Sequence, residues 1–154
     1  MDYREAYEKA LQLLNVRFLS EGELKAKLRR RGVDDDVLED VVAALEGEHF
    51  LDDQRLARDV YRYYARKGQY GHLYIVNRLR RRCLPVPEDV ERPDEYALAG
   101  DLVKRKFSYR ADEARKAARF LQYRGFSPQS YGTSWKILRS IDTLILTKSI
   151  LTLI

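Results

Sequence analysis

The chain has 154 residues, of which 45% are hydrophobic and 34% are charged, and it carries a net charge of +5. This length suits one domain or a short array of repeats, and the basic balance favours an acidic partner such as nucleic acid. A solvated helical surface carrying both signs of charge explains the same numbers equally well. The single cysteine, Cys83, excludes an intramolecular disulfide and fits a reducing compartment, so we expect a cytoplasmic protein.

Neither an export signal nor a membrane span is expected. The first residues are acidic where a signal peptide needs a basic and then an apolar run. The longest apolar stretch is the tail from Ile141. It is shorter than the roughly 20 residues that span a bilayer, and Asp142 and Lys148 interrupt it.

The first three helices are expected within residues 3–47. The apolar spacing predicts one helix over Tyr3–Val16, and Ser20 with Glu23 has the spacing of a capping box for the second. Three aspartates, residues 34–36, open the third helix. They also resemble the start of a calcium loop, but the third ligand position would fall on Leu38, so the helix start is the better interpretation.

In the middle of the chain, Asp52 and Asp53 are expected to cap a helix that ends at Gly68, and Gly71 precedes the next helix. Prolines at positions 85, 87 and 93 then leave any third helix short or absent. This segment is the best candidate for a bend.

The last part begins with a helix from Pro93 or Asp94 to about Phe107, followed by a helix over residues 110–124. Ser127 and Pro128 are typical of a helix start, with Tyr131, Trp135 and Leu138 on the buried face. The tail from Ile141 has no clear period, and it is either a capping helix, a strand paired elsewhere, or a foreign or frame-shifted end.

A ten-residue pattern occurs three times in these elements, at Leu24–Val33, Ile75–Leu84 and Ala117–Phe126. Each copy has an apolar residue, a Leu four positions later, then Arg, a small residue and a large apolar one. Residues four apart share a helix face, Arg in the last turn complements the dipole, and glycine suits the left-handed turn that ends a helix. We therefore expect an all-α fold of three tandem three-helix repeats, at residues 1–51, 52–92 and 93–140, with a tail at 141–154.

Residues for catalysis or metal binding are scarce. His49, His72 and Cys83 are the only His and Cys residues, and His72 and Cys83 would stand roughly 16 Å apart along a helix. A zinc site needs about four closely spaced ligands. We therefore expect no enzyme, no metal and no cofactor.

Binding surfaces are the remaining candidates. Basic side chains crowd the repeated helices, and they either follow a phosphate backbone or only complement helix dipoles. The candidates for nucleic-acid binding are Lys25, Arg29, Arg30, Lys104, Arg105, Lys106, Arg115 and Arg119. Among the tyrosines, Tyr61 and Tyr64 fit a core stripe, whereas Tyr63, Tyr70 and Tyr74 are candidates for exposed contacts.

Residues 20–84 resemble the RecX family, regulators of the RecA recombinase. The resemblance rests on Ser20-x-x-Glu23-Leu24 with Lys27-Leu28 and Gly32, on Phe50-Leu51-Asp52-Asp53-x-Arg55-Leu56-Ala57, and on the pair Gly68 and Gly71. Further along the chain, Leu121 followed by Gly125-Phe126 is similar to the family's third repeat. The resemblance extends over about residues 3–139, and it is specific as a combination.

The resemblance implies a curved, elongated, right-handed array that binds RecA in the deep groove of the RecA–DNA filament. It also implies inhibition of the RecA ATPase and of strand exchange, without a cofactor. We expect a monomer that also binds single- or double-stranded DNA weakly. The expected RecA contacts are Arg62, Arg66, Tyr70, Tyr74, Arg78, Arg81 and Arg82.

Three features depart from the family pattern: Cys83 in place of glycine, the prolines of the second repeat, and the tail beyond Arg139. Two other functions stay open. One is a basic helical DNA-binding module, although the recognition helix from Asp34 would be acidic. The other is a helical scaffold that binds some other protein.

Overall fold

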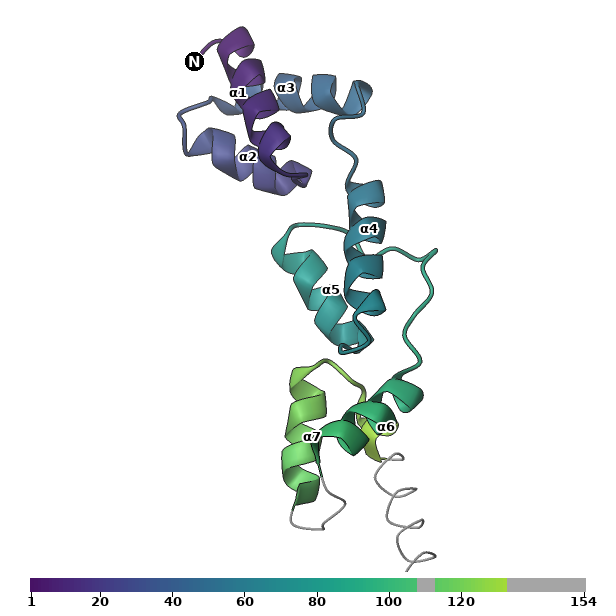
Figure 1. Ribbon diagram of the computed structural model, residues 1–154. Helices are drawn as coiled ribbons and strands as arrows, with labels where there is room; N and C mark the ends of the chain where they lie inside the picture. Colours follow the sequence, from purple (N-terminus) through teal and green to yellow (C-terminus); the bar gives the residue numbers. More distant parts are fainter. Residues whose placement is uncertain (108–112, 133–154) are drawn as a thin grey trace, which may run out of the picture. The chain divides into compact units, whose positions relative to one another are not determined.

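The computed structural model describes residues 1–107 and 113–132, which fold into α-helices without any strand (Figure 1). This confirms the all-α prediction. The helices are α1 (Tyr3–Val16), α2 (Glu21–Arg29), α3 (Asp35–Gly47), α4 (Asp53–Arg66), α5 (His72–Arg81), α6 (Glu95–Lys106) and α7 (Ala114–Tyr123). A further helix occupies residues 128–132.

The helix starts follow the capping signals of the sequence. Before α2, the Ser20 hydroxyl accepts the Glu23 backbone N–H at 3.1 Å, and the Glu23 carboxylate accepts the Ser20 N–H at 2.9 Å. Asp2 and Asp94 cap α1 and α6 in the same way, without the reciprocal bond. Asp34 precedes α3 but makes no side-chain cap bond, so the acids of that helix act through their charge.

The chain divides into two compact units. Unit 1 consists of Met1–Arg62 and Val76–Val90, and unit 2 consists of Tyr63–Ile75 and the chain from Glu91 onward. Helices α4 and α5 therefore each supply residues to both units. The boundaries of the three repeats stay a prediction.

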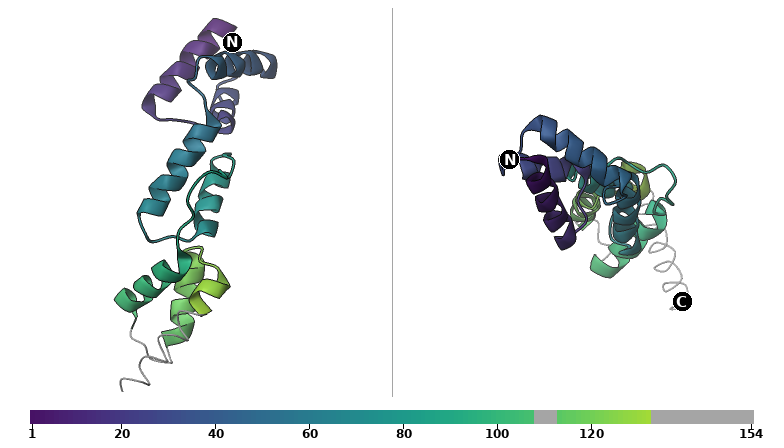
Figure 2. Two further views of the ribbon diagram at one scale, coloured as in Figure 1. Left: turned by 90° about the vertical axis from the view of Figure 1, so that its right-hand side faces the viewer. Right: turned by 90° about the horizontal axis from the view of Figure 1, so that it is seen from above.

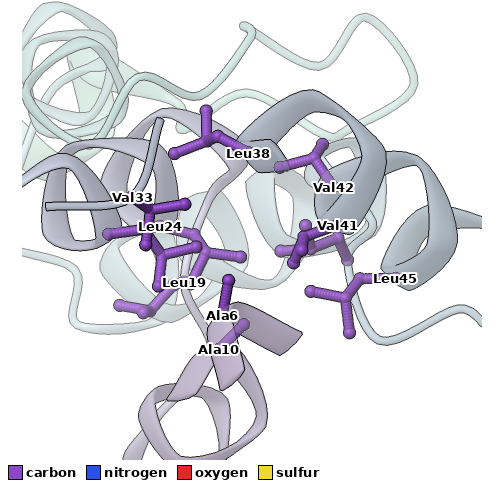
Figure 3. Packing of buried hydrophobic residues seen from close by; sticks show 11 residues of the cluster. Ala6, Ala10, Leu19, Leu24, Val33, Leu38, Val41, Val42 and Leu45 are labelled. Carbon is purple, nitrogen blue, oxygen red and sulfur yellow. The ribbon is translucent and has the colours of Figure 1, made fainter. Parts of the chain in front are cut away.

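In unit 1, helices α1, α2 and α3 contact one another pairwise (Figure 2). Figure 3 shows side chains of the three helices pointing into a shared core. Ala6 and Ala10 are fully buried, so α1 approaches its neighbours closely through small side chains. Tyr3, at the start of α1, is 45% exposed and stacks on Tyr7.

In unit 2, a smaller core joins α6, α7 and the turn that follows α7. Its buried side chains are Ala99, Val103, Ala117, Leu121 and Phe126. Helix α7 is described from Ala114, so its expected start at Arg110 lies outside the described residues, as do Trp135, Leu138 and the tail.

Residues 82–94, which contain the three prolines, form no helix. This agrees with the expectation that the third helix of the second repeat is short or absent. The prolines fix φ and lack the N–H groups that a helix needs.

The three copies of the repeated pattern end in the same turn. The large apolar residue donates its N–H to the Leu carbonyl five positions earlier: Val33 to Leu28, Leu84 to Leu79, and Phe126 to Leu121. The small residue before it has a positive φ each time, +80° at Gly32, +55° at Cys83 and +77° at Gly125. Cys83 thus adopts the left-handed conformation in spite of its Cβ, at a cost of about 1–2 kcal/mol.

Candidate interaction surfaces

Two equivalent joints, one in each unit, link the first residues of two helices. In unit 1, the N–H of Glu21, the first residue of α2, donates to Asp53, the first residue of α4, at 3.0 Å. In unit 2, the N–H of His72, the first residue of α5, donates to Glu95, the first residue of α6, at 2.9 Å. The same acid position therefore satisfies the same unpaired helix N–H in both joints.

The turn after a repeated helix closes each joint. A Cβ on Gly22, in the first turn of α2, would lie 2.6 Å from the Cβ of Cys83. A Cβ on Gly125 would overlap the backbone nitrogen of Tyr74, in the first turn of α5. Both contacts are too close for a larger residue, so the joints select small side chains at these positions.

Arg82, expected to contact a partner, is an internal brace of unit 1. Its guanidinium donates to both oxygens of Glu23 at 3.1 Å and to the Phe18 carbonyl at 2.8 Å. Arg17 donates to the same carboxylate at 2.7 Å. Burial raises the pKa of Glu23, but the hydrogen bonds from Arg82 and from the Ser20 N–H outweigh it, so the pKa lies below its usual value.

The tyrosines form a cluster in unit 2. The Tyr70 and Tyr74 rings stack with centroids 4.0 Å apart, and Tyr64 contacts both edge-on at 5.8 Å. Lys67 lies over the Tyr63 ring at 4.5 Å, and Arg124 over the Tyr70 ring at 5.2 Å. The structure thus brings together Tyr70 and Tyr74, which are half-buried, with the Arg124 guanidinium over the Tyr70 ring.

The other expected RecA contacts are divided between the units. Arg62, Arg78 and Arg81 belong to unit 1, whereas Arg66 belongs to unit 2 with the tyrosines. Arg62, Arg66 and Arg81 are exposed and Arg78 is half-buried.

The expected nucleic-acid contacts also fall into two groups. Lys25 pairs with Glu21 at 2.6 Å and with Glu39 at 2.8 Å, and these contacts raise its pKa. Arg29 pairs with Asp35 at 2.8 Å. The remaining cations are exposed: Arg30, Lys104, Arg105, Lys106, Arg115 and Arg119. Their largest concentration is on α6 and α7.

Within residues 1–107 and 113–132, no group of three His, Cys, Asp or Glu residues could hold a metal ion. No helix of the described residues is long and apolar enough to cross a membrane. The joint acids Asp53 and Glu95 are contacts that the sequence interpretation missed, because it treated Asp53 only as a helix cap and gave Glu95 no role.

Comparisons with known proteins fit this architecture. The profile of the first three-helix domain of RecX matches residues 6–45, which contain most of α1 to α3. The regulatory protein RecX of Pelodictyon phaeoclathratiforme is 31% identical over 137 residues, which make up 84% of this chain and 86% of that protein. The chain belongs to the RecX family. A second RecX, from Vibrio cholerae, is 32% identical over 135 residues, 82% of this chain and 88% of that protein.

The crystal structure of RecX from Lactobacillus salivarius has the same fold. It superposes with a TM-score of 0.71 at 23% identity, covering 90% of this chain and 97% of that one. RecX relatives are regulatory proteins rather than a recognised enzyme family.

Proposed function

We propose that this RecX-family chain restrains the RecA recombinase by binding in the groove of the RecA–DNA filament. It lowers ATP hydrolysis and strand exchange by RecA. The observation that carries this proposal is membership of a family of regulatory proteins, over most of the chain's length.

The contact surface that we assign combines tyrosines and arginines. Tyr70 and Tyr74 present a preassembled aromatic pair, and Arg66 is exposed in the same unit. Tyrosine and arginine dominate the energetic centres of protein interfaces because both bury apolar area and keep a polar end. Arg62, Arg78 and Arg81, in unit 1, are further contacts that we assign, whereas Arg82 is engaged by Glu23 and by the Phe18 carbonyl within that unit.

DNA is a secondary ligand in this proposal. The cations of α6 and α7 supply weak contacts to phosphates, either single- or double-stranded. Lys25 and Arg29 contribute less, because carboxylates already neutralise them.

Hydrolysis of ATP by RecA on single-stranded DNA tests the proposal. We expect the rate to fall as the chain is titrated in, at concentrations well below those that coat bare DNA at the same salt. An unchanged rate, or a loss only once the DNA is saturated, overturns it.

A double charge reversal tests the assigned contact residues separately. Arg66→Glu/Arg81→Glu is expected to raise the half-inhibitory concentration at least tenfold, because each reversal replaces an attraction by a repulsion. The control Arg4→Glu/Lys9→Glu makes the same change in net charge on α1. Equal inhibition by both folded variants contradicts the assignment.

A further inference from the structure

An apolar groove lies in unit 1. It has a volume of about 710 Å³, between the end of α1 and the turn after α3. Its apolar lining comes from Leu11, Leu14, Val16, Phe18 and Phe50. A smaller hollow of about 130 Å³ continues from it toward α4, sharing Phe18, His49 and Phe50 as a common wall.

The groove exposes an unusual amount of large apolar side chain. Val16 is 83% exposed, Phe18 77% and Phe50 51%. Single exposed apolar residues are ordinary, but three around one hollow make a contiguous patch of the kind that marks an interaction site. Among the residues that the structure describes, neither core includes the side chains of Val16, Phe18 or Phe50.

The walls of the groove are held in place. The Phe18 carbonyl accepts the Arg82 guanidinium at 2.8 Å. Phe50 and Leu51 both donate their N–H groups to the Leu45 carbonyl, at 2.9 and 3.2 Å. His49, between them and α3, takes a φ of +62° to close that turn. A site with fixed walls loses little entropy when it binds.

The smaller hollow has more acidic than basic side chains in its lining. Asp52 and Asp59 line the smaller hollow with Arg55. Asp59 forms no ion pair with any other residue that the structure describes. Arg17, in the larger groove, is neutralised by Glu23.

We propose that this groove docks an apolar segment of RecA that carries a flanking lysine or arginine. Phe18 and Phe50 are the anchors, and Asp59 is the partner of the basic side chain. The inference rests on the proposed function and adds a second contact to the tyrosine surface. The chemistry follows from the site, because an apolar floor beside a free carboxylate favours apolar and basic groups together.

The test measures inhibition of the RecA ATPase and binding of the full chain to RecA filaments. Phe18→Ser and Phe50→Ser are each expected to weaken both at least tenfold, the usual effect of removing an anchor residue. Both side chains are exposed, so the fold should survive, as circular dichroism can verify. Leu73→Ser is the matched control, since Leu73 is 54% exposed in unit 2, and it should change binding less than twofold.

The proposed contact between Asp59 and a basic side chain of RecA is tested by Asp59→Lys. This variant should weaken binding, and wild-type binding should respond more to added salt than variant binding does. Full inhibition by folded Phe18→Ser and Phe50→Ser variants overturns the inference, and so does a change confined to self-association of the chain. If the wild-type chain itself neither inhibits nor binds RecA, both the proposed function and the groove inference are overturned. If the wild type binds and the groove variants bind equally well, only the groove inference is overturned.

Discussion

Cys83 holds a φ of +55° in a turn where the two equivalent residues are glycines. Left-handed geometry costs a residue with a Cβ about 1–2 kcal/mol. Glycine avoids this cost but makes the unfolded chain more flexible, which reduces the net gain in stability. Cys83→Gly should therefore raise the free energy of unfolding by about 0.5–1 kcal/mol, read from the midpoint of urea denaturation. Gly125→Ala should lower it, since the added Cβ overlaps Tyr74. A less stable Cys83→Gly protein contradicts this account of the turn.

The stability of the folded protein should depend on pH through the ion pair between Glu23 and Arg82. The pKa of Glu23 is lowered in the folded state, so its contribution is complete above the unfolded value of about 4.3 and is lost as pH falls through the folded value. Glu23→Gln should make the protein less stable at pH 7 and flatten the decline of stability on acidification. Urea denaturation at several pH values measures both curves. Parallel declines of wild type and variant would show that Glu23 does not stabilise the fold through its charge.

At the scale of elements, the two joints differ in one instructive way. Glu95 accepts two backbone N–H groups, from His72 at 2.9 Å and from Ser127 at 3.0 Å. Asp53 accepts the backbone N–H of Glu21. The residue equivalent to Ser127 in this joint is Pro85, which lacks an N–H. Burial, outweighing the bond from Glu21, raises the pKa of Asp53.

Substitutions should separate these two acids. Glu95→Ala leaves two backbone N–H groups without their acceptor and should cost about 2–3 kcal/mol, against about 1 kcal/mol for Asp53→Ala. Asp53→Asn keeps an acceptor and removes a charge that burial disfavours, so its stability at pH 7 should equal or exceed that of the wild type. Thermal and urea unfolding of the three variants check this order. A strongly destabilised Asp53→Asn protein would show that the charge itself holds the joint.

Local signals make most helices of this chain predictable. The cap residues Ser20, Asp52 and Asp94, together with the apolar spacing, indicate helix starts close to those observed. The joint between Glu21 and Asp53 and the contact between Glu23 and Arg82 are not predictable, because they link residues across long stretches of chain that carry no periodic signal. From the sequence alone, Arg82 therefore looks like a surface residue. The repeated pattern places it correctly, directly before the left-handed turn residue Cys83.

At the scale of the whole molecule, the repeated pattern and the family motif indicate an all-α RecX-like fold that the structure and the comparisons confirm. The curvature of the array and its position in a RecA filament stay predictions. The groove around Phe18 has no signature in the sequence, because exposed apolar residues look like core residues until the core is known.

The central claim is that the partner is the RecA filament and not DNA alone. The most direct measurement is fluorescence anisotropy of the chain, labelled at its N-terminus, with RecA–single-stranded DNA filaments and with bare DNA at physiological salt. The account predicts binding to filaments at least tenfold tighter than to bare DNA, and loss of that preference in the Arg66→Glu/Arg81→Glu variant. Equal affinity for filament and bare DNA, falling steeply with salt in both cases, would contradict it and leave a basic helical DNA-binding protein.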